Sequence, residues 1–404
     1  MRYVIAGGGV AGVTAAKEIR KQDPEGEVEL FSSEPYPYYY RPKLWEFIAG
    51  KIAPEETYYR PENWYADQGI QLHLNSTVVG LDVEGKTLSL KDGQEVLFDK
   101  LVIASGARSF VPPVEGADME GVFALRTLDD AKSIAACADT VKSAVLIGGG
   151  LLGLETAKAL VDRGLKVSVV EFMSRLLPRQ LDEAGADVLQ AYLEKQGLEI
   201  YLDAKTERIT AGSDSLTVLL ADGRKIEAGM VVFSTGIRSN IEPWKSCGLP
   251  VGRGVQVDEY LMTASEGIYA VGDAAEFKGF VYGIIPAATE QGKIAGANMV
   301  KPKSKIYKGT VPSTRLKIVG MEFNAYGDAT LDGDDVLVRR VVEKEAGRYE
   351  RLAIQDGCIR GAILLGDPKK AVAIKRLIAV ETDVSAHVDQ LLEDGFDLKS
   401  LASA

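Results

Sequence analysis

The sequence predicts an α/β protein with two doubly wound, three-layer domains and a smaller C-terminal α+β domain. An apolar strand, a glycine-rich turn and a helix follow one another at residue 7, and the same order recurs 141 residues later, at residue 148. Strands that alternate with helices are typical of parallel sheets. Three short strands over 336–364, followed by a helical segment over 368–380, predict the antiparallel C-terminal domain.

Composition narrows the class of protein. The chain has 404 residues, enough to bury a large core without a disulfide or metal. Lys and Arg number 47 against 58 Asp and Glu, a net charge of −11 that argues against a nucleic-acid or anionic-membrane binder. Three scattered cysteines without a CxxC motif, and only two histidines, predict no metal site. We expect a cytoplasmic protein without a signal peptide.

The first glycine motif has the form expected of a phosphate-binding turn. In Gly7-x-Gly9-x-x-Gly12, the first glycine permits the tight turn, the second lets the backbone approach a pyrophosphate, and the third lets helix and strand pack closely. Val10 and Ala11 begin the helix, whose free N–H groups favour an anion. The motif therefore predicts a dinucleotide site.

The second motif repeats the first in every part. Gly148-x-Gly150-x-x-Gly153 follows an apolar strand, and Leu151 and Leu152 begin the next helix. Two complete motifs predict two dinucleotide sites and hence two dinucleotides. The simplest protein of this kind is a flavoprotein that is reduced by a nicotinamide.

A carboxylate follows each motif at the end of the next strand. Glu34 lies 27 residues after the first glycine of its motif, and Glu171 lies 23 residues after the first glycine of the second. Each is placed to accept hydrogen bonds from a ribose diol. A carboxylate repels a 2′-phosphate, so Glu171 favours NADH over NADPH, although Arg175 is nearby.

Over residues 1–370 the chain resembles the FAD-dependent pyridine nucleotide–disulfide oxidoreductase family. The segments LVIASGA, VFSTGI, GIYAVGDA and ALRTLD match those of the family, and Gly236 in the second of them would contact NAD. The helix predicted over 286–299 would direct its positive end at the flavin. Beyond the first glycine motif, the resemblance implies FAD contacts from Glu34, Arg41, Lys43, Ala104, Ser105, Gly106, Arg126, Gly272, Asp273 and Ile285.

The resemblance also implies the order of the domains. A discontinuous FAD-binding domain would contain residues 1–112 and 236–305. An NAD(H)-binding domain would be inserted over 113–235, and the C-terminal α+β domain would cover 306–404.

The absence of cysteine after the first strand–helix–strand unit indicates which subclass of the family the chain resembles. Disulfide reductases carry a CxxxxC motif after the first strand–helix–strand unit, and several NADH oxidases carry a single cysteine there. Residues 35–51 of this chain contain no cysteine. The Tyr-Arg-Pro motif of that segment resembles rubredoxin and ferredoxin reductases and the flavin portion of NADH-dependent nitrite reductase. The resemblance implies an enzyme that takes hydride from NADH onto flavin N5 and reduces a small acidic carrier such as rubredoxin.

Two other functions fit the same motifs. One is a peroxide-forming NADH oxidase, in which dioxygen is the acceptor. The other is a redox sensor, or a subunit of a larger reductase, that binds flavin and NADH.

The family often places a lysine beside flavin N5, paired with a glutamate. Glu46 occupies the aligned position here, and Lys43 is the nearest amine. We predict a Lys43–Glu155 pair as the catalytic pair, which would stabilise the reduced flavin. The alternative is that Lys43 is a solvated loop residue.

Residues 291–321 contain no acidic side chain. In a chain of net charge −11, this basic segment predicts a docking face for an acidic redox protein, centred on Arg315 and Lys317. A solvated connection between domains is the alternative, and a homodimer is possible.

Overall fold

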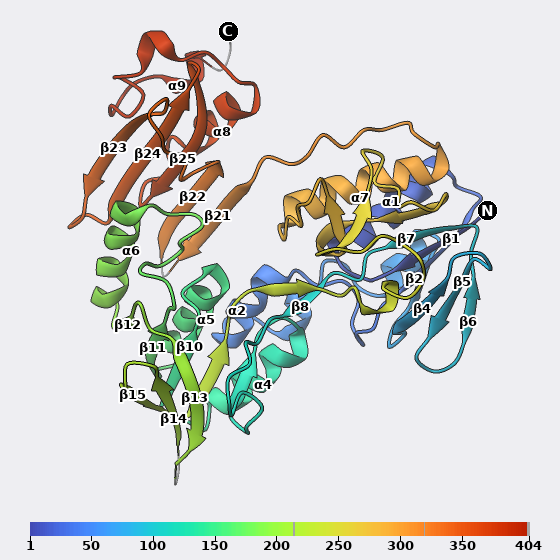
Figure 1. The fold of residues 1–404 in the computed structure, drawn as a ribbon, viewed down its shortest axis with the longest axis horizontal. Coiled ribbons are helices and arrows are strands. Elements are labelled where there is room, and N and C mark those ends of the chain that lie inside the picture. Colours follow the sequence, from blue (N-terminus) through green and yellow to red (C-terminus); the bar gives the residue numbers. More distant parts are fainter. Residues whose placement is uncertain (213–214, 319, 402–404) are drawn as a thin grey trace. The chain divides into compact units, whose positions relative to one another are not determined.

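The computed structural model describes residues 1–212, 215–318 and 320–401, and the chain divides into two compact units (Figure 1). Unit 1 contains Met1–Lys43, Ala53–Arg108 and Ile237–Thr310. Unit 2 contains Leu44–Ile52, Ser109–Gly236 and Val311–Ala404. In the part of the chain that the structure describes, no helix is both long and apolar enough to cross a membrane.

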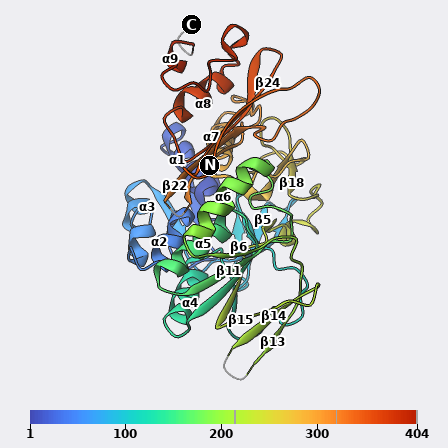
Figure 2. The ribbon, with the colours of Figure 1, turned by 90° about the vertical axis from the view of Figure 1, so that its left-hand side faces the viewer.

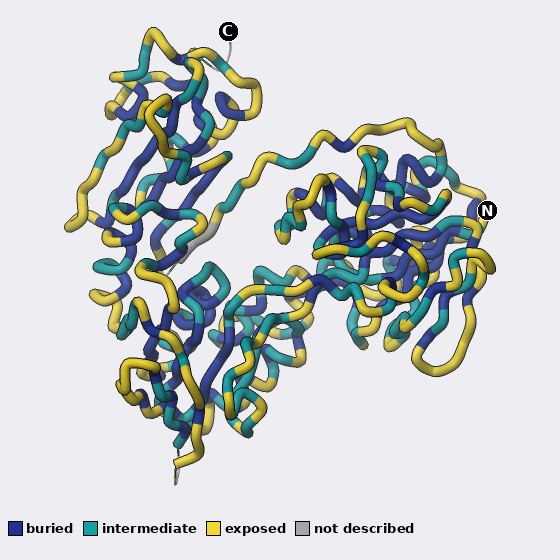
Figure 3. Tube along the Cα trace, viewed as in Figure 1, coloured by how far each residue is buried: buried dark blue, intermediate teal, exposed yellow. Residues whose placement is uncertain are grey.

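Unit 1 is built on a five-stranded parallel sheet of order β19-β7-β1-β2-β3. One face, with Tyr3 and Ile5, packs against two helices, and the other, with Val4 and Ala6, packs against a small antiparallel sheet. Because both faces are covered, strands β1 and β7 are apolar and buried beyond their first residue, whereas β2 and β3 also carry polar residues (Figure 3). The strands are β1 (Arg2–Ala6), β2 (Glu27–Phe31), β3 (Ile70–His73), β7 (Lys100–Ile103) and β19 (Ile268–Ala270).

The two helices on this sheet are α1 (Val10–Gln22) and α7 (Ile285–Val300). A Cβ added to Gly292 would lie 2.5 Å from the carbonyl oxygen of Ala11, so the helices touch almost backbone to backbone. Gly296 makes the same kind of approach to α1. A proline in the first turn begins α7, as the sequence predicts.

The other elements of unit 1 are short. The antiparallel sheet β4-β5-β6 covers the second face, and β18 pairs with β20. Strands β8 and β17 pair where the chain leaves unit 1 and where it returns. The bounds are α3 (Asn63–Asp67), β4 (Val78–Asp82), β5 (Thr87–Leu90), β6 (Glu95–Leu97), β8 (Ala107–Ser109), β17 (Ile237–Ser239), β18 (Val255–Val257) and β20 (Ala275–Phe277).

Unit 2 repeats the design with a parallel sheet of order β12-β11-β10-β16-β9. The antiparallel sheet β13-β14-β15 shares a core with it and projects beyond it (Figure 2). The elements are α2 (Leu44–Ile48), β9 (Val122–Ala124), α4 (Leu128–Ala138), β10 (Ser143–Ile147), α5 (Leu151–Asp162), β11 (Lys166–Val170), α6 (Glu183–Lys195), β12 (Glu199–Tyr201), β13 (Thr206–Ala211), β14 (Leu216–Leu220), β15 (Lys225–Ala228) and β16 (Met230–Phe233).

The C-terminal part of unit 2 is an antiparallel sheet of order β21-β22-β25-β24-β23, with α8 packed on it. The predicted α+β class is confirmed, although the strand count was wrong, because β21 and β22 add two strands to the three predicted. The elements are β21 (Ser313–Ile318), β22 (Met321–Gly327), β23 (Leu337–Glu343), β24 (Arg348–Gln355), β25 (Cys358–Leu365), α8 (Ala371–Ala379) and α9 (Leu398–Leu401).

The carboxylate of Asp182, which caps α6, joins this C-terminal sheet to the rest of unit 2. It accepts hydrogen bonds from the hydroxyl of Tyr349 (2.6 Å) and from Nε of Arg340 (3.2 Å). Nε of the buried Arg351 also lies 3.2 Å from it. The structure thus groups the C-terminal sheet with the predicted NAD(H) domain in one unit, and the three predicted domain boundaries stay predictions.

Candidate dinucleotide-binding sites

Two glycines of the first motif are required by the fold itself. Gly7 has φ +131°, and a Cβ on it would lie 2.0 Å from the carbonyl oxygen of Ala104. A Cβ on Gly12 would lie 2.0 Å from the carbonyl oxygen of Gly7. No side chain fits at either place, so these residues close the turn between β1 and α1.

Gly9 and Gly106 face open space instead. Gly9 is the N-cap of α1 and has no side-chain capping bond, and the nearest atom to a Cβ built there is Nη1 of Arg41, 3.9 Å away. A Cβ on Gly106 would meet nothing within 4 Å. The turn therefore leaves a cradle beside the free N–H groups of Val10 and Ala11, which suits a pyrophosphate.

Predicted FAD residues gather around this cradle. Arg41 donates a 2.5 Å hydrogen bond to Glu34, which also accepts from the hydroxyl of Tyr39. Burial opposes the charge of Arg41, but Tyr39, Glu34 and Asp273 raise its pKa. A permanent cation thus lies next to the turn, where a pyrophosphate would need one.

The cradle is also held by Gln291, Asn240 and Trp244, which no sequence motif predicted. Gln291 is buried, and its side-chain oxygen accepts a 2.7 Å hydrogen bond from the backbone N–H of Gly272. The side chain of Asn240 donates a hydrogen bond to the carbonyl of Ser105 at 2.9 Å, and Nε1 of Trp244 donates one to the hydroxyl of Ser105 at 3.1 Å. No motif marks these residues, because their partners lie far away in the sequence.

The second motif has the same geometry in unit 2. A Cβ on Gly148 would lie 2.3 Å from the carbonyl oxygen of Ser234, and one on Gly153 would lie 2.1 Å from that of Gly148. Gly150 is the N-cap of α5, without a side-chain capping bond, and a Cβ on it would meet nothing within 4 Å. Gly236 is equally open. Leu151 and Leu152 supply the first free N–H groups of α5, as predicted.

Glu171 is fixed at the edge of this second turn. One carboxylate oxygen accepts a hydrogen bond from the N–H of Gly149 (2.6 Å), and the other accepts one from Met173 (2.8 Å). The guanidinium of Arg175 donates to the carbonyls of Pro178 and Leu181. The nearby positive charge is therefore bound to its own loop, and the arrangement favours a free ribose diol over a 2′-phosphate.

The two sites differ at one equivalent position. The N–H of Gly7 bonds the carbonyl of Phe31, and that of Gly148 bonds Val170, each at 2.8 Å. By this register Ser32 in unit 1 corresponds to Glu171 in unit 2. Glu34 comes two residues later, and its carboxylate is bonded to Arg41 instead of to the turn.

The predicted Lys43–Glu155 pair divides between the units. Lys43 in unit 1 donates to the carbonyl oxygen of Glu56 at 3.1 Å. Glu155 on α5 in unit 2 is buried, and burial, with a smaller effect of Glu46, raises the pKa of its carboxyl to about 8. Arg126, which directly precedes the N-cap of α4, also belongs to unit 2. The pair and the FAD contact of Arg126 stay predictions.

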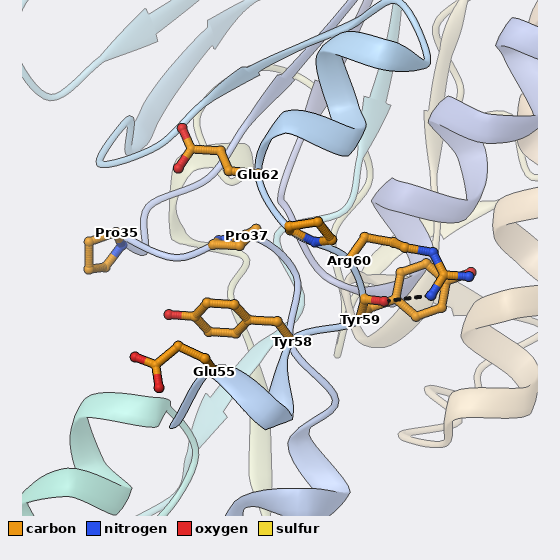
Figure 4. Close-up of a pocket in the computed structure, with 8 residues that line it drawn as sticks. Pro35, Pro37, Glu55, Tyr58, Tyr59, Arg60 and Glu62 are labelled. Carbon is orange, nitrogen blue, oxygen red and sulfur yellow. Dashed lines mark hydrogen bonds between the residues drawn. The ribbon is translucent and has the colours of Figure 1, made fainter. Parts of the chain in front are cut away.

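A separate cavity of about 510 Å³ lies in unit 1 beside residues 36–40, which contain four tyrosines and are called here the tyrosine-rich loop (Figure 4). Figure 4 shows the ring of Tyr58 close to Glu55, and a hydrogen bond of 3.0 Å from Arg60 to the carbonyl of Tyr59. None of the predicted site residues lines it. The lining residues are Pro35, Pro37, Glu55, Tyr58, Tyr59, Arg60, Pro61 and Glu62.

Comparison with known proteins agrees with this geometry. Residues 1–292 match the pyridine nucleotide-disulphide oxidoreductase family, and residues 312–382 match the rubredoxin NAD+ reductase C-terminal domain. The chain is 36% identical to nitrite reductase [NAD(P)H] of Bacillus subtilis over 95% of its own length and 48% of that protein. It spans about half the length of the first curated relatives that it matches.

Two further similarities extend over nearly whole proteins. Rubredoxin-NAD(+) reductase of Pseudomonas putida is 31% identical, with 93% of this chain and 98% of that protein covered. The ferredoxin reductase for the CYP199A2 system of Rhodopseudomonas palustris has a TM-score of 0.91 at 27% identity, with 99% of both chains covered. The resemblance and the fold class that the sequence predicted are confirmed, and the chain belongs to the pyridine nucleotide-disulphide oxidoreductase family.

Proposed function

We propose that the chain is an NADH-dependent FAD reductase that passes electrons to a small redox protein such as rubredoxin, without a cysteine relay. The observation that carries this proposal is the pair of open helix N-termini at Gly9 and Gly150, one in each unit. The matches to rubredoxin reductases and to their C-terminal domain support the choice of acceptor.

The residues of unit 1 fit FAD. The N–H groups at the start of α1 and the guanidinium of Arg41 would hold the pyrophosphate, and Glu34 would bind the ribose. Asp273 would bind the ribityl chain, as the resemblance implies. When bound, FAD supplies the exchange between a two-electron donor and a one-electron acceptor.

The residues of unit 2 fit NADH. The N–H groups at the start of α5 would bind its pyrophosphate, and Glu171 would accept hydrogen bonds from its ribose diol. Because that carboxylate would repel a 2′-phosphate, we propose NADH and not NADPH as the electron donor.

The cysteines support direct transfer to the acceptor. Cys247 donates to the carbonyl of Trp244, and Cys358 donates to that of Glu381. Cys137 lies on α4, where burial raises the pKa of its thiol. None of the three belongs to a predicted site segment, so the flavin would pass its electrons to the acceptor without a thiol intermediate.

The acceptor would be an acidic protein in the cytoplasm. Of the two residues at the centre of the predicted docking face, Arg315 is exposed on β21, while the side chain of Lys317 lies outside the described residues. A homodimer is compatible with this proposal and is tested by the mass of the enzyme in solution.

Stopped-flow reoxidation of the NADH-reduced enzyme tests the function. We expect fast reoxidation by rubredoxin and slow reoxidation by dioxygen. Fast dioxygen consumption with stoichiometric peroxide would establish the oxidase instead. Slow reoxidation by rubredoxin, ferricyanide and dioxygen alike would leave the sensor or subunit role and would refute the proposal.

A further inference from the structure

A second cavity in unit 1, of about 450 Å³, lies between α1, α7 and the tyrosine-rich loop. We call it the lysine groove. Its lining combines an apolar floor, a tyrosine wall and a charged outer rim. The lining residues are Val10, Val13, Thr14, Lys17, Glu18, Lys21, Tyr38, Tyr40, Tyr59, Ile285, Thr289 and Lys293.

One end of the groove reaches the cofactor turn. Val10 is the first residue of α1 and directly follows Gly9, the glycine that faces the open cradle. Ile285 is the first residue of α7. The groove therefore leads from the proposed FAD site outward along two helices that are packed rigidly against each other.

The other end of the groove is positively charged. Lys17, Lys21 and Lys293 are exposed on its rim. The carboxylate among the lining residues is that of Glu18, and it already accepts a 2.6 Å hydrogen bond from Gln22. In a chain of net charge −11, this rim presents a local excess of positive charge.

The tyrosine wall is joined to this rim. Nζ of Lys17 donates a 3.1 Å hydrogen bond to the hydroxyl of Tyr59 and lies 5.7 Å from the ring centre of Trp64. An ammonium group has three N–H donors, so others remain for a partner. Tyr40 is 40% exposed and offers apolar contact area of the kind that is enriched at protein interfaces.

We propose that the lysine groove is a second docking surface, in addition to the one predicted at Arg315 and Lys317, for the small acidic redox protein that receives the electrons. This inference rests on the proposed function and names a surface that serves it. Carboxylates of the carrier would pair with the three lysines and draw it to the groove. Its surface loop would pack on the tyrosines, which brings it next to the FAD site.

The test measures binding directly. The affinity of FAD-loaded enzyme for purified rubredoxin is determined by calorimetry in 50 mM and 500 mM NaCl. The triple variant Lys17→Glu/Lys21→Glu/Lys293→Glu should raise Kd at least tenfold at 50 mM NaCl. That difference should shrink at 500 mM NaCl, because salt screens exposed charges. Since Lys17 also holds Tyr59, the double variant Lys21→Glu/Lys293→Glu is measured beside it and should raise Kd in the same direction.

The matched control reverses three other exposed lysines of unit 1, in Lys91→Glu/Lys245→Glu/Lys278→Glu, with the same change in net charge. An equal loss of affinity in this control, or less than a twofold change in the test variants, would overturn the inference. So would a wild-type dimer that only the triple variant dissociates, since the groove would then bind a second copy. If wild-type enzyme binds no rubredoxin and reduces none, the proposed function has failed, and not the choice of surface.

Discussion

At the scale of single residues, the surroundings of Glu155 raise the pKa of its carboxyl. It lies on α5, and Glu46 on α2 is the charged group that affects it most. Burial and this second carboxylate both disfavour its ionised form. Its carboxyl is therefore protonated at neutral pH in the folded chain and ionised in the unfolded chain.

The substitution Glu155→Gln should change how stability depends on pH. A raised folded-state pKa contributes stability that is present below the unfolded value of 4.5 and is lost as pH rises through about 8. The glutamine variant has no carboxyl to ionise, so its stability relative to wild type should rise by roughly 5 kcal/mol between pH 4 and pH 9. Chemical denaturation at both pH values measures this, and an unchanged difference would contradict it. Glu46→Gln should reproduce only a small part of the gain, because burial is the larger cause.

Glu171 should decide both the affinity for the nicotinamide and its selectivity. Replacing it by Ala removes the acceptor of the Gly149 and Met173 N–H groups and the negative charge beside the ribose. We expect Kd for NADH to rise about tenfold or more and the preference over NADPH to fall. Fluorescence titration with both nucleotides measures this. Glu207→Ala, at an exposed site of unit 2, should leave both affinities unchanged.

At the scale of elements, each glycine turn contains some glycines that the fold requires and others that are open for binding a nucleotide. Gly150→Ala adds a methyl group where the protein has no atom within 4 Å, at φ −79°, which alanine adopts readily. Gly148→Ala places the same group against the carbonyl of Ser234. The Gly150→Ala variant should keep its Tm and bind NADH at least tenfold more weakly. The Gly148→Ala variant should unfold at a lower Tm. Thermal unfolding and NADH titration of both variants measure these effects. A lowered Tm in Gly150→Ala would show that the turn at Gly150 is not open.

The contact between α6 and the C-terminal sheet should depend on Asp182. Asp182→Ala leaves the buried guanidinium of Arg351 without its carboxylate and α6 without its cap. A loss of about 3 kcal/mol follows for a buried pair that loses one partner. The midpoint of urea unfolding measures it. Asp187→Ala, exposed on the same helix, should change the stability by less than about 0.5 kcal/mol.

The sequence predicted those structural elements that depend on residues close to one another in the chain. Both glycine turns, with their helices and strands, follow from spacing within about thirty residues. The Ser105–Asn240–Trp244 contacts could not be predicted, because 135 residues separate the first two partners. The placement of Lys43 and Glu155 in separate units depends likewise on where the whole chain folds, and no local pattern encodes it.

At the scale of the whole molecule, we expect the docking of an acidic redox protein to depend on where the basic residues lie and not on the net charge of the chain. Residues 291–321 carry only basic charges, and β21 presents Arg315 to solvent. The variant Arg315→Glu/Lys317→Glu should lower the ratio of rubredoxin to ferricyanide reduction rates about tenfold at low salt. Steady-state rates at two salt concentrations measure the ratio. A ratio that stays constant would remove Arg315 and Lys317 from the docking face.

Unit 1 is assembled from distant parts of the chain, and this affects how it can form during synthesis. Strand β19 and helix α7, which complete its sheet and cover it, come after residue 267, whereas the parallel sheet of unit 2 is complete within residues 109–236. On a ribosome the chain emerges from its N-terminus. The second glycine turn can therefore reach its final form while the first still lacks α7, so the proposed NADH site would mature before the proposed flavin site that precedes it in the sequence.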